Sequence, residues 1–395
     1  MANNNENKIL NVPHLRFPEF TGEWKKCVLQ DVVAFSNGKA HENCVNENGD
    51  YVLVNSKFVS TNGQVQKRVT SQLSPLCKSQ FVMVMSDLPN GKALAKCYYI
   101  EDDHKFTLNQ RICSFTAKDR NISRFLMYQI NRNKYYMRFD DGINQTNLKK
   151  SEVLSCPVFI PSIHEQEKIA TMLHLLDERI ATQTKIIEKQ QSLIKGIVDN
   201  LMTALLKGEL YPFSSFYIKA GEGGTPTTSV DEYYSEGTIP FIKIDDLSCK
   251  YLTSNKEFIT ELGMQKSSAW LIPSQSVIYS NGATIGAISI NEYPVCTKQG
   301  ILGIVPNTNV NVEYLFLLMS SSFFSKEVNR IITEGTMKTA YLKDINHIKC
   351  PLPSMAQQKS ITNLTSSIEE KLYTEKKLLK FLNLQKQHLL RTMFI

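Results

Sequence analysis

Residues 161–201 read PSIHEQEKIATMLHLLDERIATQTKIIEKQQSLIKGIVDNL, and their spacing of apolar side chains predicts one long helix. From Ile169 onward, apolar or amide side chains recur after alternating steps of four and three residues. This is the heptad spacing of a coiled-coil seam. The seam positions are Ile169, Leu173, Leu176, Ile180, Gln183, Ile187, Gln190, Ile194, Ile197 and Leu201.

The same element occurs a second time, 192 residues further along the chain. Pro353-Ser354 repeats Pro161-Ser162, and Cys350-Pro351 just before it repeats Cys156-Pro157. Each segment predicts a helix of about 40 residues, because Gly196 is the one Gly or Pro in either run. The second seam has three polar interruptions and comprises Ile361, Thr365, Ile368, Leu372, Glu375, Leu379, Leu382, Lys386, Leu389 and Met393.

A seam of this length needs a partner, and the matching seam in the same chain supplies one. We therefore predict an antiparallel intramolecular coiled coil with pseudo-two-fold symmetry. The alternative is that each helix packs on its own domain.

The segments between the two helices also correspond. Leu108-Asn109-Gln110-Arg111 is matched by Thr297-Lys298-Gln299-Gly300, and Leu148-Lys149 by Leu342-Lys343. Residues 122–130 and 312–320 predict helices, whereas 52–54, 81–85, 239–244 and 277–279 predict short strands. The predicted fold is α+β, with two globular mixed α/β domains, called heads below, joined by the two long helices. The predicted boundaries are 1–160 for the first head, 161–206 for the first helix, 207–352 for the second head and 353–395 for the second helix.

Composition allows a polyanionic partner without requiring one. The chain has 45 Lys+Arg against 38 Asp+Glu, a net charge of +7. The excess is uneven: residues 1–160 hold 21 basic and 15 acidic residues, whereas residues 207–352 hold 12 and 14. The nine cysteines form no C-x-x-C pair and predict reduced core residues and no metal site. A polar start and short apolar clusters indicate a cytoplasmic protein with no membrane segment.

Sequence signatures of catalysis are absent. The chain has no G-x-x-x-x-G-K-[ST] phosphate loop, no G-x-S-x-G elbow and no Asn/Asp-Pro-Pro-Tyr/Phe loop of an amino-methyltransferase. The acidic pairs at 102–103, 140–141 and 245–246 leave a metal-dependent nuclease as one alternative, although adjacent acids in turns are typical of solvated loops. We predict a protein without a catalytic site or cofactor of its own.

At this point the chain resembles the specificity subunits of type I restriction-modification systems. The resemblance lies in Pro161–Ile169 with its shorter copy Pro353-Ser354-Met355-Ala356-Gln357-Gln358, in Gly223-Gly224-Thr225-Pro226, and in Arg16-Phe17-Pro18-Glu19-Phe20 with Trp24. It implies two target recognition domains that each read half of a split double-stranded DNA sequence, and helices that set the spacer between the halves.

The resemblance also implies partners. Two modification (methyltransferase) subunits would dock on the helices and bring S-adenosylmethionine, and restriction (translocase/endonuclease) subunits would bring ATP and Mg²⁺. A second alternative is a stand-alone DNA-binding or coiled-coil scaffold protein without enzyme partners.

Base readout needs Arg, Lys, Asn, Gln or hydroxyl side chains in loops that can reach base edges or phosphates. In the first head the candidates are Lys57, Asn90, Lys92, Arg111, Arg138 and Gln145. In the second head they are Thr225, Lys243, Asn281, Thr284, Gln299, Lys338 and Thr339.

Overall fold

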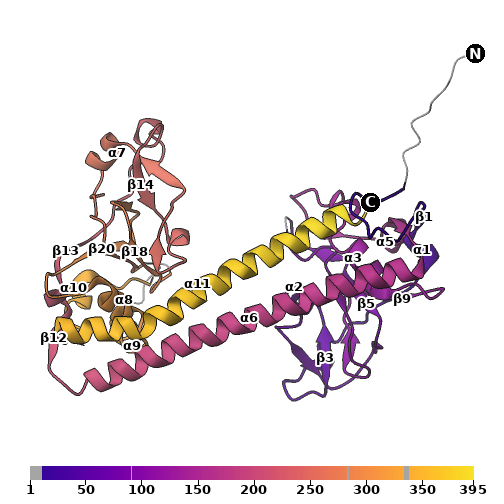
Figure 1. Ribbon diagram of the computed structural model, residues 1–395, viewed down its shortest axis with the longest axis horizontal. Helices are drawn as coiled ribbons and strands as arrows, with labels where there is room; N and C mark the ends of the chain where they lie inside the picture. The colour runs from indigo at the N-terminus through magenta and orange to yellow at the C-terminus, as the bar shows by residue number, and fades with distance from the viewer. Residues whose placement is uncertain (1–10, 90, 283, 333–337) are drawn as a thin grey trace, which may run out of the picture. The chain divides into compact units, whose positions relative to one another are not determined.

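A computed structural model describes residues 11–89, 91–282, 284–332 and 338–395. They form two compact units, one built from the chain up to Gln183 together with Leu378–Ile395 and the other from Thr184–Lys377 (Figure 1). Each unit holds one head and the adjoining parts of both long helices, α6 (Ile163–Leu205) and α11 (Met355–Thr392). The two predicted helices are therefore confirmed.

The first head contains short strands and helices in a fixed order. These are β1 (Lys25–Val28), α1 (Leu29–Val32), β2 (Val33–Asn37), η1 (Glu42–Cys44), β3 (Tyr51–Val54), α2 (Ser56–Ser60), β4 (Lys67–Val69), β5 (Phe81–Val84), β6 (Ser86–Asp87), β7 (Cys97–Tyr99), β8 (Phe106–Leu108), β9 (Ile112–Ala117), α3 (Ser123–Ile130), α4 (Lys134–Met137), β10 (Thr146–Asn147), α5 (Lys150–Leu154) and β11 (Pro157–Ile160).

The second head follows nearly the same order. Its elements are β12 (Leu210–Pro212), η2 (Phe213–Phe216), β13 (Tyr217–Glu222), η3 (Asp231–Tyr233), β14 (Ile239–Ile242), η4 (Ile244–Asp246), β15 (Tyr251–Leu252), β16 (Glu257–Ile259), α7 (Glu261–Gln265), β17 (Val277–Ser280), β18 (Ile288–Asn291), β19 (Cys296–Thr297), β20 (Ile301–Pro306), α8 (Val312–Ser320), α9 (Ser322–Ile331), α10 (Leu342–Ile345) and β21 (Lys349–Pro351).

Each head is built around a central sheet whose middle strands are buried on both faces. In the first head this sheet has the order β2-β9-β5-β7, and a second sheet has the order β4-β3-β8. Side chains alternate along β5: Phe81 and Met83 join the core beneath α3, whereas Val82 and Val84 join the core against the second sheet. Burial on both faces explains why β5 reads as an uninterrupted apolar run.

The second head repeats this layering. Its central sheet has the order β13-β20-β17-β18-β15, and its second sheet has the order β16-β14-β19. Along β17, Val277 and Tyr279 join the core with α8, whereas Ile278 joins the other core. In both second sheets the middle strand has one antiparallel and one parallel neighbour. The internal repeat read from the sequence is thus a repeat of topology.

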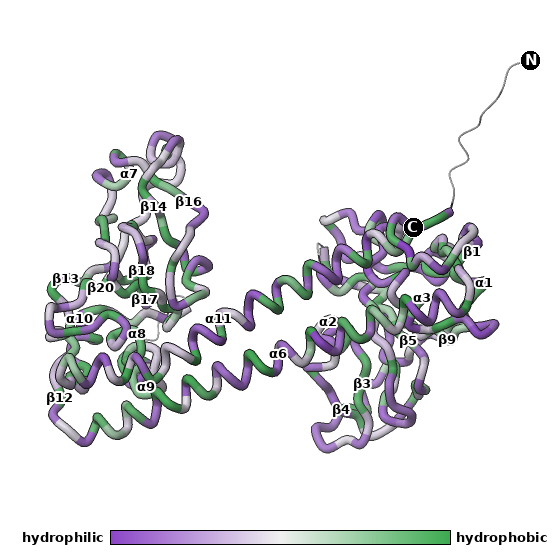
Figure 2. The backbone as a smooth tube through the Cα atoms, viewed as in Figure 1, coloured by the Kyte–Doolittle hydropathy of each residue, from purple (hydrophilic) through white to green (hydrophobic). Residues whose placement is uncertain are grey.

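In each unit, seam residues of both α6 and α11 contribute to one hydrophobic core. All twenty seam positions are buried or half-buried. In the first unit, Ile169 and Leu173 near the start of α6 share a core with Met393 at the end of α11. In the second unit, Ile194 and Leu201 near the end of α6 pack on the core that holds Ile361 at the start of α11. The helices therefore run antiparallel, and Figure 2 shows hydrophobic and hydrophilic residues alternating along both. Packing of each helix on its own head alone is excluded.

Two details of the sequence interpretation need correction. All nine cysteines are free, but Cys77 and Cys249 are exposed and only five are fully buried. The N–H of Leu148 donates to Met85 O (2.8 Å), and the N–H of Ala340 makes the same bond to Asn281 O (2.9 Å). Leu148 therefore corresponds to Ala340, two residues before the predicted Leu342.

Within the part of the chain that the structure describes, no helix has the length and apolar character required to cross a membrane. No cluster of three or more His, Cys, Asp or Glu side chains with metal-binding geometry occurs there either.

Candidate nucleic-acid interface

In the second head, loops from four parts of the chain meet where strands of both sheets end. The N–H of Gly223, just after β13, donates to Ile301 O (2.9 Å). The N–H of Asn281, just after β17, donates to Gly300 O (3.0 Å), and the Ala340 N–H returns to Asn281 O (2.9 Å). These bonds hold together one loop cluster, formed by residues 223–226, 281–286 (Ala283 excepted), 297–300 and 338–340.

Glycine allows the close approach of backbones in this cluster. A Cβ on Gly223 would lie 2.0 Å from Thr297 O, and one on Gly224 would lie 2.5 Å from the Ala269 nitrogen. The two glycines of the Gly-Gly-Thr-Pro motif are therefore required by backbone packing. In the first head, a Cβ on Gly38 would lie 1.9 Å from Asn109 O. Gly38 thus allows the same close approach of two backbones as Gly223, although the residues beside the two glycines differ.

The first head has an equivalent loop cluster, formed by residues 37–41, 55–57, 85–92 (Asn90 excepted), 108–111 and 145–148. The Lys39 N–H donates to Leu108 O (3.1 Å), and the Asn109 N–H to Val54 O (3.1 Å). In the second head, Lys298 N–H makes the corresponding bond to Ile242 O (3.0 Å). Asn109 and Lys298 therefore hold the same place, as the sequence alignment predicted.

Arg111 and Gly300 also occupy the same place. Arg111 has φ 65° and Gly300 has φ 84°, both in the left-handed region. The Arg111 carbonyl accepts the N–H of Met85 (2.9 Å), just as the Gly300 carbonyl accepts that of Asn281. A backbone turn that favours glycine thus carries an exposed arginine in the first head.

Four of the six candidates in the first head lie at its loop cluster. Lys57, on α2, and Lys92 and Arg111, in loops, are exposed. Gln145 is exposed too, but its Nε2 donates to Ser86 Oγ (2.8 Å), which joins two loops of the cluster.

The other two candidates differ. Arg138 ends α4, and its guanidinium lies 4.0 Å from the ring centre of Tyr135 and 4.9 Å from that of Phe139. These stacking contacts give Arg138 a role in packing. Asn90 lies outside the described residues.

All seven candidates in the second head lie at or beside its loop cluster. Gln299, Thr284 and Lys338 are exposed, and Thr339 is half-buried. Thr225 Oγ1 accepts the N–H of Gln299 (3.3 Å), so these two neighbours are fixed together.

Lys243 and Asn281 are engaged within the protein. The Lys243 ammonium forms an ion pair with Glu257. Asn281 is fully buried, and its Nδ2 donates to Ala340 O (3.1 Å). In this structure the Asn281 amide supports the loop cluster and is turned away from solvent.

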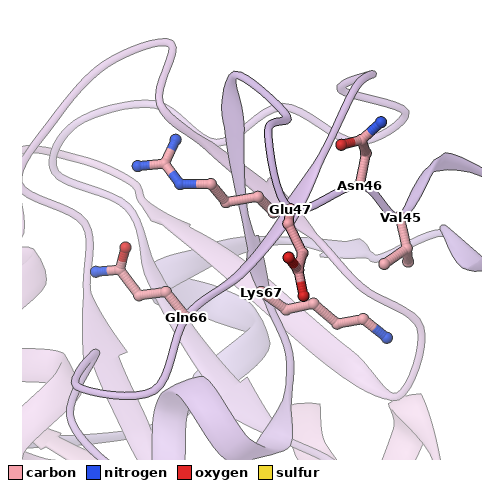
Figure 3. Close-up of a pocket in the computed structure, with 6 residues that line it drawn as sticks. Val45, Asn46, Glu47, Gln66 and Lys67 are labelled. Carbon is pink, nitrogen blue, oxygen red and sulfur yellow. The ribbon is translucent and has the colours of Figure 1, made fainter.

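The sequence interpretation missed a polar hollow on the second sheet of the first head. It has a volume of about 420 Å³ and is lined by Val45, Asn46, Glu47, Gln66, Lys67 and Arg68 (Figure 3). Lys67 and Arg68 belong to β4, and Lys67 pairs with Leu53 near the end of β3 that leads to Lys57. The polar run Gln66-Lys67-Arg68 could have indicated this hollow from the sequence. Its position near the loops, however, follows only from the pairing of β4 with β3.

The electrostatics of the two heads differ. The first head presents exposed Lys57, Lys67, Lys92 and Arg111. In the second, Glu257 pairs with Lys243, and Glu222 accepts the N–H of Gly300 (2.7 Å). The second head therefore combines exposed Lys298 and Lys338 with neighbouring carboxylates, which reduce the net attraction of this loop cluster to phosphates.

Acidic residues in a loop of the first head also have local partners. Asp141 accepts the backbone N–H groups of Asn144 and Ile143 (both 2.8 Å), which hold the pKa of this exposed carboxyl below its usual value. These bonds stabilise a turn at Asp140-Asp141, as the sequence predicted for adjacent acidic residues. The turn lies close to Gln145 in the sequence.

Comparison with known proteins gives matches along most of the chain. The chain is 28% identical over 158 residues to the type I restriction enzyme MjaIX specificity subunit of Methanocaldococcus jannaschii, which covers 39% of this chain and only 36% of that relative. The MjaVIII specificity subunit of the same organism is 22% identical over 92% of this chain and 89% of its own length. The chain thus spans about a third of the length of the first relative and nearly all of the second.

A solved structure has the same fold. The crystal structure of the type I restriction-modification system S subunit from M. genitalium matches 97% of this chain and 99% of its own, with a TM-score of 0.60 and 18% identity. The family model described as "Type I restriction modification DNA specificity domain" matches residues 21–190 and 217–384, once for each head and its helix. This chain therefore belongs to the family of type I restriction-modification DNA specificity proteins.

Proposed function

We propose that this chain is the DNA-recognition subunit of a type I restriction-modification complex and that each head reads one half of a bipartite target. The observation that carries this proposal is the duplicated loop cluster. Both heads gather exposed polar side chains where two sheets end, and both are mounted on the same pair of helices. Two readers that share one pair of helices suit a target whose halves are separated by a fixed number of base pairs.

The catalytic steps belong, in this proposal, to partner subunits. Two modification subunits would bring S-adenosylmethionine and the methylation chemistry, and restriction subunits would bring ATP, Mg²⁺ and cleavage. The chain itself would position these partners on DNA, in the cytoplasm. Its membership in the specificity family supports this division of labour.

The long helices offer surfaces on which partners can dock. Leu175 is 58% exposed and Leu193 is 53% exposed on α6, and Phe381 is 65% exposed and Leu384 is 50% exposed on α11. None of these four belongs to the seam between the helices. Large apolar side chains exposed along a helix are typical of protein interfaces.

The test is to co-express the chain with its modification subunit and to map methylated adenines across the host genome. We expect the subunit to be retained at two copies per chain and the methylated sites to share two half-sequences at a constant separation. Purification of the chain without a partner, together with an unmethylated genome, would favour the stand-alone DNA-binding or scaffold function.

A further inference from the structure

One glutamine at the start of each long helix ties that helix to its head. Gln166 is 1% exposed. Its Oε1 accepts the N–H of Ile122, the residue that caps α3 (3.0 Å). Its Nε2 donates to Pro161 O and to Asn121 Oδ1 (both 3.1 Å). The side chain therefore joins α6 to both the segment before it and the first turn of α3.

Gln358, 192 residues later, makes the same set of contacts in the second unit. It is fully buried, and its Oε1 accepts the N–H of Asn311, which caps α8 (2.7 Å). Its Nε2 donates to Pro353 O (2.8 Å) and Asn309 O (2.9 Å). The joint between helix and head is thus duplicated at the level of single hydrogen bonds.

A second polar contact lies eleven residues further along each helix. In the first unit, Asp177 accepts the Tyr128 hydroxyl of α3 (2.7 Å) and pairs with Lys386 of α11. Burial and the neighbouring carboxylate raise the pKa of Tyr128, so its hydroxyl keeps the proton that it donates.

In the second unit, the equivalent carboxylate is Glu369, again 192 residues away. It pairs with Lys250, which precedes β15 and also pairs with Glu313 of α8 (3.3 Å). Lys250 is 14% exposed, so this contact is shielded from solvent.

Two contacts at this spacing restrict a helix more than its apolar packing does. Eleven residues are about three turns, so both side chains lie on one helix face about 16 Å apart. Apolar packing is not directional and allows small slips and tilts, whereas buried hydrogen bonds are lost when donor and acceptor move apart. One contact prevents sliding, and the two together prevent rotation of the head about the first.

We propose that Gln166 with Asp177, and Gln358 with Glu369, are positioning residues that set the angle of each head on its helix and thereby the spacer length that the complex accepts. The inference rests on the proposed function. It assigns the choice of spacer to the joints between heads and helices in addition to the length of the helices themselves.

The experiment uses the complete complex with its modification subunits. Once the wild-type target is mapped, plasmids carry its two half-sequences with the native spacer or with one base pair added or removed. Methylation rates are then compared for the wild type, Gln166→Leu, Gln358→Leu and the milder Tyr128→Phe and Lys250→Arg, the last of which keeps the positive charge beside Glu313 and Glu369. Gln191→Leu, at an exposed glutamine of α6, is the matched control.

For the wild type and Gln191→Leu we expect a misplaced half-site to slow methylation by at least about 100-fold, because every base pair of that half falls out of register. In the joint variants this ratio should fall at least severalfold, while the bases read in each half stay the same. The mild variants keep the test decisive if a Gln→Leu chain does not fold.

An unchanged ratio in joint variants that still methylate the native target would overturn the proposal, even if their melting temperatures fall. A wild-type complex without any bipartite target would instead contradict the proposed function. The two failures are therefore distinguishable.

Discussion

Arg111 and Gly300 occupy the same turn in the two heads. At this turn the cost of the backbone conformation can be distinguished from a role of the side chain in DNA binding. The turn needs a positive φ, which costs a non-glycine residue about 1 kcal/mol. An arginine retained in this conformation is exposed among the loops of the first head. This placement favours a role for its side chain in DNA binding.

Arg111→Gly should separate the two effects. We expect the free energy of unfolding to stay within about 1 kcal/mol of wild type, because glycine relieves the backbone. Methylation of the target should slow about 10- to 100-fold, because a guanidinium contact to a base or phosphate is lost. Thermal unfolding and methylation assays of the complex measure both.

Gly300→Ala is the converse control. It should destabilise the second head by about 1 kcal/mol, because alanine is strained at φ 84°. If the Arg111→Gly complex methylated the target at the wild-type rate, the proposed contact of Arg111 with DNA would be wrong.

Other single residues show where local patterns lose their predictive power. Loop position and residue type singled out Asn281 as a base reader, but its amide is buried against Ala340, 59 residues away. Lys67 and Arg68 were not among the candidates, and only the pairing of Lys67 with Leu53 places them near the loops. In both cases the deciding contact is long-range, and no local pattern encodes it.

At the scale of the element, α6 presents two kinds of leucine within one turn. Leu173 is fully buried in the core that contains Met393, whereas Leu175 is 58% exposed. The heptad rule separated them correctly, because Leu173 is a seam position and Leu175 is not. Periodicity predicted both long helices and the six strand and helix segments, because these depend on repeated spacing, whereas the antiparallel direction was inferred from the similar size of the intervening domains.

The two leucines should respond differently to truncation. Leu173→Ala should lower the free energy of unfolding by about 2 to 5 kcal/mol, because it leaves a cavity in a packed core. Leu175→Ala should change it by less than about 0.5 kcal/mol but weaken retention of the modification subunit. Calorimetry and co-purification test this pair.

Equal destabilisation by both variants, or undiminished retention with Leu175→Ala, would contradict the assignment of faces.

The joints at Gln166 and Gln358 could not be assigned from the sequence in the same way. The repeated glutamine was visible, but its partners at Ile122 and Asn311 are set by the tertiary fold.

For the whole molecule, the uneven charge of the heads limits what the chain can do alone. The first head segment carries a balance of +6 (21 basic, 15 acidic) and the second a balance of −2 (12 basic, 14 acidic). A reader that neutralises few phosphates gains little from counterion release. Many of the contacts to DNA phosphates should therefore come from the modification subunits.

The isolated chain should accordingly bind its target at least about 100-fold more weakly than the complex, with a shallower dependence of the logarithm of affinity on that of salt. Fluorescence anisotropy titrations at several salt concentrations measure both quantities. An isolated chain that matched the complex in affinity and salt slope would contradict this division of the interface.

The proposed function requires that each head reads one half of the target independently of the other. The most direct measurement is to replace residues 1–150 with the corresponding head of a relative and to map methylated adenines for the exchanged and the native complex. We predict that one half-sequence changes while the other half and the separation are kept. A change in both halves, or in neither, would contradict the account.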